Sequence, residues 1–277
     1  MSHLLREHAP ITEAGWSRID DEARERLTPA LAARRLIDFS GPHGWQHSAT
    51  NLGRIDRIAK PPGGGLDAAQ RRVLPLVELR APFAISRSEL ADGDRGAEDV
   101  DFAALDDAAR RLAVAENTAV FHGWKGGAIT GISQASPHDA VALGTDCERY
   151  PQHVAKAVQA LLEIGIDGPY GLALGPETYS LVLETSEHGG YPLLEHLRKI
   201  LDGPLVWAPG VDGGVVLSLR GGDFLFECGQ DIAIGYDHHD ARDVELYFVE
   251  SFSFRVATPE AAVALPTAAA RAARKGR

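Results

Sequence analysis

The chain has little cysteine and no long apolar run. Cys147 and Cys228 are its only cysteines in 277 residues, and they lie too far apart for metal-ligand spacing or a disulfide framework. This scarcity indicates a reducing, cytoplasmic compartment. No apolar stretch approaches ~18 residues, so we expect no transmembrane helix and no membrane partner. The first residues lack the apolar segment of a secretory signal.

Recognised catalytic and cofactor signatures are also missing. The sequence contains no Gly-x-Gly-x-x-Gly after a strand, no phosphate loop, no Gly-x-Ser-x-Gly and no His-Glu-x-x-His. The best metal candidate is Asp237-His-His-Asp240, which an acidic turn between two strands explains as well. His188 and His196 flank a glycine-rich loop, but no nucleophile accompanies them. We therefore expect no enzyme, no cofactor and no metal.

Two further sets of chemically capable residues have simpler explanations. Cys228 lies in an apolar strand beside Phe226, which favours an inert core thiol over a nucleophile. Three carboxylates on or just after a helix suit a solvated face better than a glycosidase pair. They are Glu177, Glu184 and Glu187.

Positive charge is scarce, with 28 basic residues against 39 acidic ones and a net charge of −11. This balance argues against nucleic acid as a partner and favours a soluble chain. The composition, 44% hydrophobic and 24% charged, is that of a folded protein with a substantial core or two domains.

The last third of the chain carries the strongest pattern, three consecutive strands from Gly221 onward. The third strand is unusually long, because apolar residues alternate from Val244 to Val256 and only Glu250 interrupts them. This period of two predicts one buried face. Thirteen extended residues span roughly 43 Å, against a usual strand of about 5–6 residues. A strand of this length suits an elongated plate better than a compact enzyme core.

The rest of the chain mixes helices and strands, which predicts an α+β fold. Apolar residues at helical spacing, with proline and glycine at segment ends, predict five helices. Residues 46–72 contain Lys60-Pro-Pro-Gly-Gly-Gly65 and are interpreted as a two-stranded arm, with a surface loop as the alternative. The expected helices are 11–31, 101–121, 151–164, 176–183 and 193–201, and the other expected strands are 35–39, 73–87, 168–174, 204–208 and 214–219.

Eight stretches, in order and spread over nearly the whole chain, resemble the encapsulin family. Each is weak alone, but together they identify the chain as similar to family 1 bacterial encapsulins, also called linocin- or bacteriocin-like proteins. The stretches are Leu4–Trp16, Arg34–Trp45, Pro75–Arg80, Gly165–Tyr170, His188–Pro192, Arg220–Phe224, Gly229–Tyr236 and Glu250–Phe254.

The resemblance implies the Hong Kong 97-type fold of tailed-phage major capsid proteins. Such a subunit has a peripheral domain with a long spine helix, an axial domain and an extended arm. The implied divisions are 1–45 for the N-terminal helix and the start of the peripheral domain, 46–72 for the arm, 73–128 for the peripheral domain with its spine helix, 129–219 for the axial domain, 220–265 for peripheral strands and 266–277 for a tail.

The resemblance also implies assembly and cargo. Family members form closed icosahedral shells of on the order of 60 copies or a multiple. They enclose a cargo enzyme, often a dye-decolourising peroxidase or a ferritin-like protein, through a targeting peptide docked on the inner wall. An extended peptide would place alternate residues in an apolar groove. Here the docking residues would be Leu27, Arg34, Leu36, Asp38, Ile232, Ile234, Tyr247 and Val249. Ordinary core packing is the alternative for each, and an internal ion pair for Arg34 with Asp38.

The five-fold pore of the family, through which small solutes pass, is lined by an axial-domain loop. In this chain that loop would be Glu187, His188, Gly189, Gly190 and Tyr191, and its histidine would respond to pH near 6–7. Two other functions stay open. One is a hydrolytic or bacteriocin-like enzyme, which lacks a visible nucleophile and base. The other is a true phage capsid protein, for which a net charge of −11 supplies no basic interior.

Overall fold

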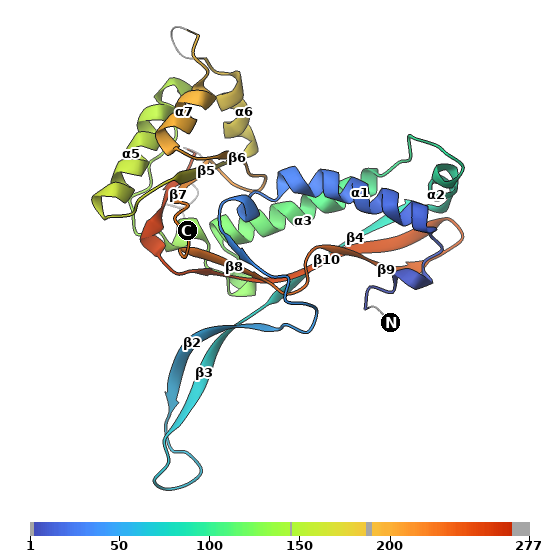
Figure 1. Ribbon diagram of the computed structural model, residues 1–277, viewed down its shortest axis with the longest axis horizontal. Coiled ribbons are helices and arrows are strands. Elements are labelled where there is room, and N and C mark those ends of the chain that lie inside the picture. Colours follow the sequence, from blue (N-terminus) through green and yellow to red (C-terminus); the bar gives the residue numbers. More distant parts are fainter. Residues whose placement is uncertain (1–2, 145, 187–189, 268–277) are drawn as a thin grey trace.

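The computed structural model describes residues 3–144, 146–186 and 190–267. It consists of two lobes and a long hairpin that projects from their junction (Figure 1). Among the described residues, no helix is both long enough and apolar enough to cross a membrane.

The helices are η1 (Arg6–His8), α1 (Glu13–Ala30), η2 (Ala33–Arg35), α2 (Arg87–Asp94), α3 (Ala103–His122), η3 (Lys125–Gly127), α4 (Ile132–Ala135), η4 (Cys147–Arg149), α5 (Tyr150–Glu163), α6 (Pro176–Glu184), α7 (Leu193–Leu201) and η5 (Pro259–Ala261). The strands are β1 (Asp38–Ser40), β2 (Ala49–Ile58), β3 (Ala68–Pro75), β4 (Val77–Ser86), β5 (Tyr170–Leu174), β6 (Leu205–Trp207), β7 (Gly214–Ser218), β8 (Phe224–Cys228), β9 (Ala233–His239), β10 (Asp243–Val256) and β11 (Ala262–Leu265).

Strand β10 is the centre of a five-stranded sheet and confirms the predicted long strand. It is 14 residues long and pairs with β4 along most of its length, from Asp243 opposite Ser86 to Phe252 opposite Val77. On its other edge, β9 pairs with its first half and β8 with its last residues. The sheet order is β1-β8-β10-β4, with β9 also bonded to β10.

Both faces of β10 are buried, which differs from the expectation of one buried face. On one face Val244, Leu246 and Phe248 pack against α1 and α3. On the other face Ser253 bonds to Thr50 at the base of the hairpin, so the chain itself covers this side. Alternation in the sequence indicated the first buried face but not the second, because most residues of the second face are polar. They are Glu245, Tyr247, Val249, Ser251, Ser253 and Arg255.

Helices α1 and α3 lie side by side on this sheet (Figure 1). The Oγ1 atom of Thr12 caps α1 by accepting a hydrogen bond from the Gly15 amide at 2.9 Å. Helix α3 is 20 residues long and ends before Gly123, whose φ of +85° few other residues adopt. Both helices lie within two residues of their predicted ends. In contrast, α2 was not predicted, although Ser86 followed three residues later by Glu89 is a known start signal.

The hairpin β2–β3, which we call the arm, extends away from both lobes (Figure 1). The predicted two-stranded structure is present, but its second strand continues to Pro75 rather than ending at residue 72. A new strand therefore begins at Val77 and not at the predicted Val73. Proline ends β3 because it has no N–H group to continue the ladder. The next amide, that of Leu76, bonds instead to the Ser48 carbonyl at 2.9 Å.

The other lobe contains a four-stranded sheet of order β11-β7-β5-β6, with α5, α6 and α7 around it (Figure 1). All five residues of β5 are buried, in agreement with the predicted short buried strand. The predicted helices 151–164, 176–183 and 193–201 correspond to α5, α6 and α7. Strand β11 pairs with β7 in this sheet. Residues 262–265 thus lie here, and not among the peripheral strands where we placed them.

Candidate functional site

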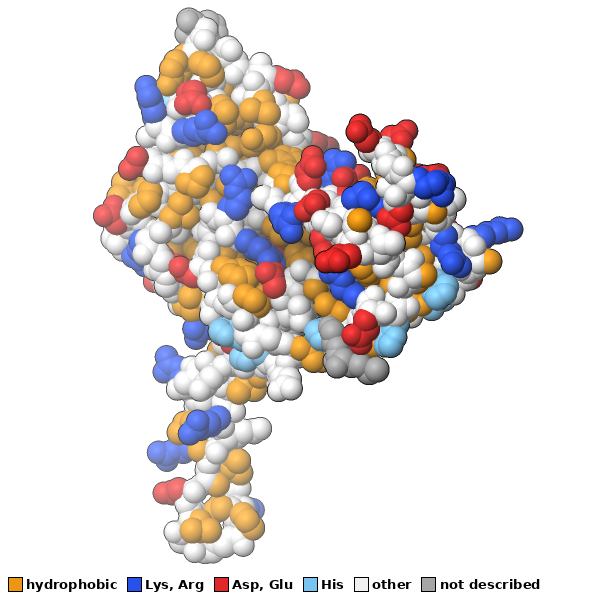
Figure 2. Space-filling view, turned by 45° about the vertical axis from the view of Figure 1, so that its right-hand side comes forward, with side chains coloured by type: hydrophobic (Ala, Val, Ile, Leu, Met, Phe, Trp, Pro, Cys, Tyr) orange, Lys and Arg blue, Asp and Glu red, His pale blue; other side chains and the backbone are white. Residues whose placement is uncertain are grey.

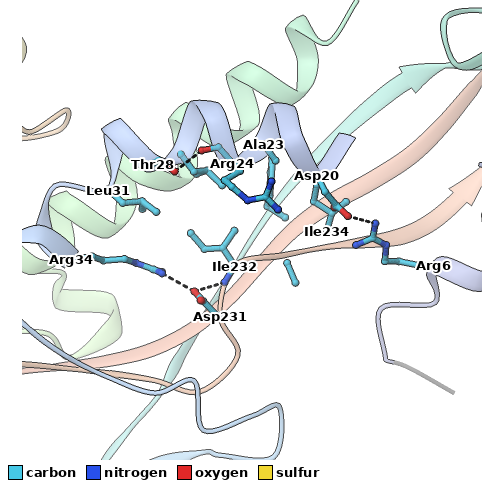
Figure 3. A pocket seen from close by; sticks show the side chains of 13 residues that line it. Arg6, Asp20, Ala23, Arg24, Thr28, Leu31, Arg34, Asp231, Ile232 and Ile234 are labelled. Carbon is cyan, nitrogen blue, oxygen red and sulfur yellow. Dashed lines mark hydrogen bonds and ion pairs between the residues drawn. The ribbon is translucent and has the colours of Figure 1, made fainter. Parts of the chain in front are cut away.

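A groove of about 420 Å³ lies on the larger sheet, between α1 and the chain that leads into β9 (Figure 3). One wall is a face of α1 that carries both apolar and polar side chains, and the other comes from η1 and residues 231–234. The residues that line it are Arg6, Asp20, Ala23, Arg24, Leu27, Thr28, Leu31, Arg34, Asp231, Ile232, Ala233, Ile234 and Phe248.

The lining of the groove follows from the periods of its two main elements. On α1, Ala23, Leu27 and Leu31 recur every four residues and so lie along one face of the helix. Residues two apart in extended chain point the same way, which brings Ile232, just before β9, and Ile234, on β9, together opposite that helix. Burial of Ala23, Leu27 and Ile234 ties these residues to the core beneath. The result is an apolar trough that an apolar side chain can enter.

Charged pairs mark the two ends of the trough. At one end an Nη atom of Arg6 lies 2.7 Å from Asp20, and its guanidinium stacks 3.9 Å from the centre of the Trp16 ring. Arg24, in the middle of the same wall, is paired with Asp21 at 2.7 Å. At the other end Arg34 lies 2.7 Å from Asp231 (Figure 3). A ligand in the trough would meet charges at both ends and at Arg24, with apolar side chains between them.

Arg34 is held by three carboxylates from separate parts of the chain. Its Nε and Nη2 atoms lie 2.8 and 2.7 Å from Glu116 of α3, and Nη2 also lies 2.9 Å from Glu250 of β10. Burial by itself lowers the pKa of Arg34, but Glu116 and Glu250 outweigh it and the net change is upward. Arg34 therefore stays charged, and its side chain has little freedom to move.

Four of the eight residues assigned to peptide docking from the sequence line this groove. They are Leu27, Arg34, Ile232 and Ile234. The sequence assignment missed the equally placed Ala23 and Leu31, although counting four residues either way from Leu27 would have found them. It also missed Asp231, which lies in a loop where no period marks it.

The other four assigned residues lie elsewhere. Leu36 and Asp38 line a separate pocket of about 180 Å³, where the Asp38 carboxylate accepts a hydrogen bond from the Gly222 amide at 2.7 Å. Tyr247 and Val249 belong to the face of β10 opposite the groove residue Phe248, since neighbouring side chains on a strand alternate. The guanidinium of Arg80 stacks 3.4 Å from the Tyr247 ring. Asp38 and Arg34 also form no ion pair among the described contacts, so the internal pair that we considered is replaced by Arg34 with Glu116, Glu250 and Asp231.

Of the residues assigned to a pore, Gly190 and Tyr191 are described by the structure, and they lie between α6 and α7. Glu187, His188 and Gly189 lie outside the described residues. Gly190 has a φ of +79° and Tyr191 is 38% exposed. The Nζ atom of Lys199 lies 5.1 Å from the Tyr191 ring centre, so a cation stands over the aromatic face.

Cys228 and Asp240, two of the chemical candidates, have structural surroundings that explain them. Burial raises the pKa of Cys228 to about 12, which keeps this thiol protonated and unreactive. Asp240 accepts hydrogen bonds from the amides of Arg242 and Asp243 and so closes the β9–β10 turn. Within the described part of the chain, no three metal-ligating side chains are placed to hold an ion.

Solved structures with a similar backbone are shells. A virus-like particle from Pyrococcus furiosus aligns with a TM-score of 0.57 and 18% identity, covering 88% of this chain and 98% of that one. The capsid of an empty GTA particle aligns with a TM-score of 0.52 and 15% identity, over 86% and 90% of the two chains. The long sheet, the long helix α3 and the projecting arm therefore have the Hong Kong 97-type capsid fold, which confirms the predicted fold.

Sequence comparison then narrows the class to one family. The model described as "Encapsulating protein for peroxidase" matches residues 1–253. A type 1 encapsulin shell protein from Rhodospirillum rubrum is 47% identical over 270 residues, covering 96% of both chains. One from Mycobacterium tuberculosis is 42% identical over 265 residues, covering 96% of this chain and 99% of that one. The chain belongs to the type 1 encapsulin shell proteins. It is accordingly a structural compartment protein and not an enzyme, as the sequence resemblance implied.

Proposed function

We propose that this protein assembles into a closed icosahedral shell of on the order of 60 copies or a multiple, and that the shell encloses a peroxidase. Membership of the encapsulin family and the peroxidase in the name of the matching family model support this cargo. A ferritin-like protein is the second candidate. The scarcity of cysteine favours assembly in the reducing cytoplasm.

The arm supplies surface for contacts between copies. Apolar side chains that a monomer would normally bury lie along it, with Ile55 and Leu66 each 62% exposed. The arm also carries five basic residues against two acidic ones in a chain of net charge −11 (Figure 2). A basic, partly apolar hairpin is complementary to the acidic surface of another copy. The phage-capsid alternative is disfavoured, because a net negative chain offers little to packaged DNA.

The groove beside α1 is the proposed docking site for a peptide of the cargo, and its apolar floor is the observation that carries this proposal. From Asp20 to Leu31 the helix rises about 16 Å at ~1.5 Å per residue. An extended peptide of about five residues at ~3.3 Å each covers that length. Alternate side chains would enter between Leu27 and Ile234, and the arginines would bind carboxylate or carbonyl oxygens.

The loop between α6 and α7 is the proposed lining of the five-fold pore, from Glu187 to Tyr191. Tyr191, at the end of this loop, is 38% exposed and so is available to line an opening between copies. A histidine at such a ring, His188, would make the passage of charged solutes depend on pH.

Two measurements test the proposal. First, the chain expressed alone is imaged by electron microscopy; uniform hollow particles are expected, and only monomers or dimers across pH and salt would overturn the shell. Second, shells purified from the native host are assayed for haem absorbance, with cargo identified by mass spectrometry. Shells without haem that contain a ferritin-like protein would replace the peroxidase by the second candidate.

A further inference from the structure

One guanidinium is shared by three carboxyl groups next to the groove. The Nη2 atom of Arg34 lies 2.7 Å from Glu116 and 2.9 Å from Glu250, while its Nη1 atom lies 2.7 Å from Asp231. The side chains of Glu116 and Glu250 are fully buried, whereas that of Asp231 is 44% exposed. The two glutamates come from different elements, α3 and β10, and both contact the same guanidinium.

The charges of this cluster do not balance if every group is ionised. A single positive charge would then face two buried negative charges and one partly exposed one. Burial of an uncompensated charge is costly, and carboxyl groups that share a buried site usually retain one proton between them. Asp231 is partly exposed, whereas Glu116 and Glu250 are fully buried, so the proton is expected on one of the two glutamates.

Unsatisfied hydrogen-bonding atoms also indicate an excess of negative charge in the cluster. The Oε1 atoms of Glu116 and Glu250 are both buried without a hydrogen-bond partner in the described structure. Two ionised carboxylates can only accept, so they cannot satisfy one another. A proton on either group turns it into a donor to the other and satisfies both. Burial and the nearby Glu116 raise the pKa of Glu250 well above its usual value, and the attraction of Arg34 only partly offsets them.

The groups around Glu250 leave few other sources of compensation. Arg34 comes from η2, Glu116 from α3, Asp231 from the chain before β9 and the protonated thiol of Cys228 from β8. The partner opposite Glu250 on β4 is the apolar Leu79. Arg34 contacts Glu116 through two nitrogens, at 2.8 and 2.7 Å, but contacts Glu250 through one, at 2.9 Å. The geometry therefore favours the proton on Glu250.

We propose that Glu250 remains protonated at neutral pH, donates to ionised Glu116, and acts as a positioning residue that keeps Arg34 directed at Asp231. The neutral carboxyl fills the space beside the guanidinium without adding a second buried negative charge. The position of the Arg34–Asp231 pair, at one end of the groove, therefore depends on the proton of the buried Glu250. This holds whatever occupies the groove.

The first test is infrared spectroscopy of wild-type shells at pH 7. A protonated carboxyl absorbs apart from a carboxylate, so a carboxylic-acid band is expected. The band is expected to disappear in Glu250→Gln and to persist in Glu78→Gln, an exposed glutamate on the neighbouring strand β4. Absence of the band from wild-type shells would overturn the proposal, and this measurement needs no variant to fold.

The second test separates positioning from simple packing. Amide hydrogen exchange of residues 230–233 reports whether Arg34 still holds Asp231. Glu250→Gln mimics the neutral carboxyl, so protection at pH 7 should stay within about twofold of wild type. Glu116→Gln removes the ionised partner of Arg34, so protection should fall about tenfold or more. Equal loss in the two variants, or loss in Glu250→Gln alone, would contradict the assignment of the proton to Glu250.

Discussion

Thr50 and Ser253 share a hydrogen bond of 2.6 Å between their hydroxyl oxygens, although 203 residues separate them. Thr50 lies at the root of the arm and Ser253 in the second half of β10, and both are buried. This contact attaches the arm to the central strand of the larger sheet. The direction in which the arm leaves the body therefore depends on a buried polar pair.

The Thr50–Ser253 pair predicts a non-additive response to mutation. Ser253→Ala or Thr50→Val alone leaves one hydroxyl without its partner in a buried place, which should cost about 1–3 kcal/mol in the free energy of unfolding. The double variant removes both hydroxyls and should lose clearly less than the sum of the two. Denaturant titration of the four proteins checks this, and strict additivity would show that the contact contributes no coupling.

A negative charge introduced into the apolar trough is expected to prevent cargo from binding while the shell still assembles. Ile232 lines the groove and is only partly buried, so Ile232→Glu should fold but repel an apolar side chain. Haem content per shell from the native host should fall about tenfold or more. Leu5→Glu, a change of the same kind at a residue 39% exposed outside the groove lining, should keep its haem. Equal haem in both variants would place the docking site elsewhere.

The two thiols are expected to differ in reactivity. Cys147 is partly exposed, whereas Cys228 is buried and its pKa is raised to about 12. A thiol-exchange reagent, an aromatic disulfide used at pH 8, should thus titrate at most one thiol per native chain and both thiols after denaturation. Cys147→Ser should abolish the native reaction. Two fast thiols in native shells would mean that the Cys228 strand opens readily.

The raised pKa of Glu250 predicts that stability declines as pH rises. The unfolded chain releases this proton near the ordinary value of 4.5, but the folded chain retains it to a higher pH. Between those two pH values the folded state binds one proton more, so its stability should fall by up to about 1.4 kcal/mol per pH unit. Glu250→Gln should flatten that slope. Unfolding midpoints measured from pH 5 to pH 9 test this, and parallel slopes for both proteins would contradict it.

Much of the fold could be predicted because its signals are local. Alternation predicted the long strand β10, and the four-residue stripe on 11–31 predicted α1. Pairing between distant segments left no such trace. Strand β11 pairs with β7 through residues that lie 45 or more positions apart in the sequence. The residues Ala262–Leu265 themselves do not indicate which of the two sheets they join.

The groove was predictable only where its residues also carry a core pattern. Leu27 and Ile234 are buried apolar residues at regular spacing, and both line the same groove. Tyr247 and Val249 have the same character but face the other side of the sheet. Asp231 and Glu116 act through a single distant arginine, and their contribution depends on a charge balance that appears only when the chain is folded.

Strand β10 belongs to both hydrophobic cores. Val244 and Phe248 pack with α1 and α3, while Phe252 and Phe254 pack into the core that includes the smaller sheet. One lobe cannot rotate on the other unless β10 bends or its ladder of hydrogen bonds breaks. We therefore expect the two lobes to move as one unit, and we expect the curvature of a shell to be set at the contacts between subunits rather than inside each subunit.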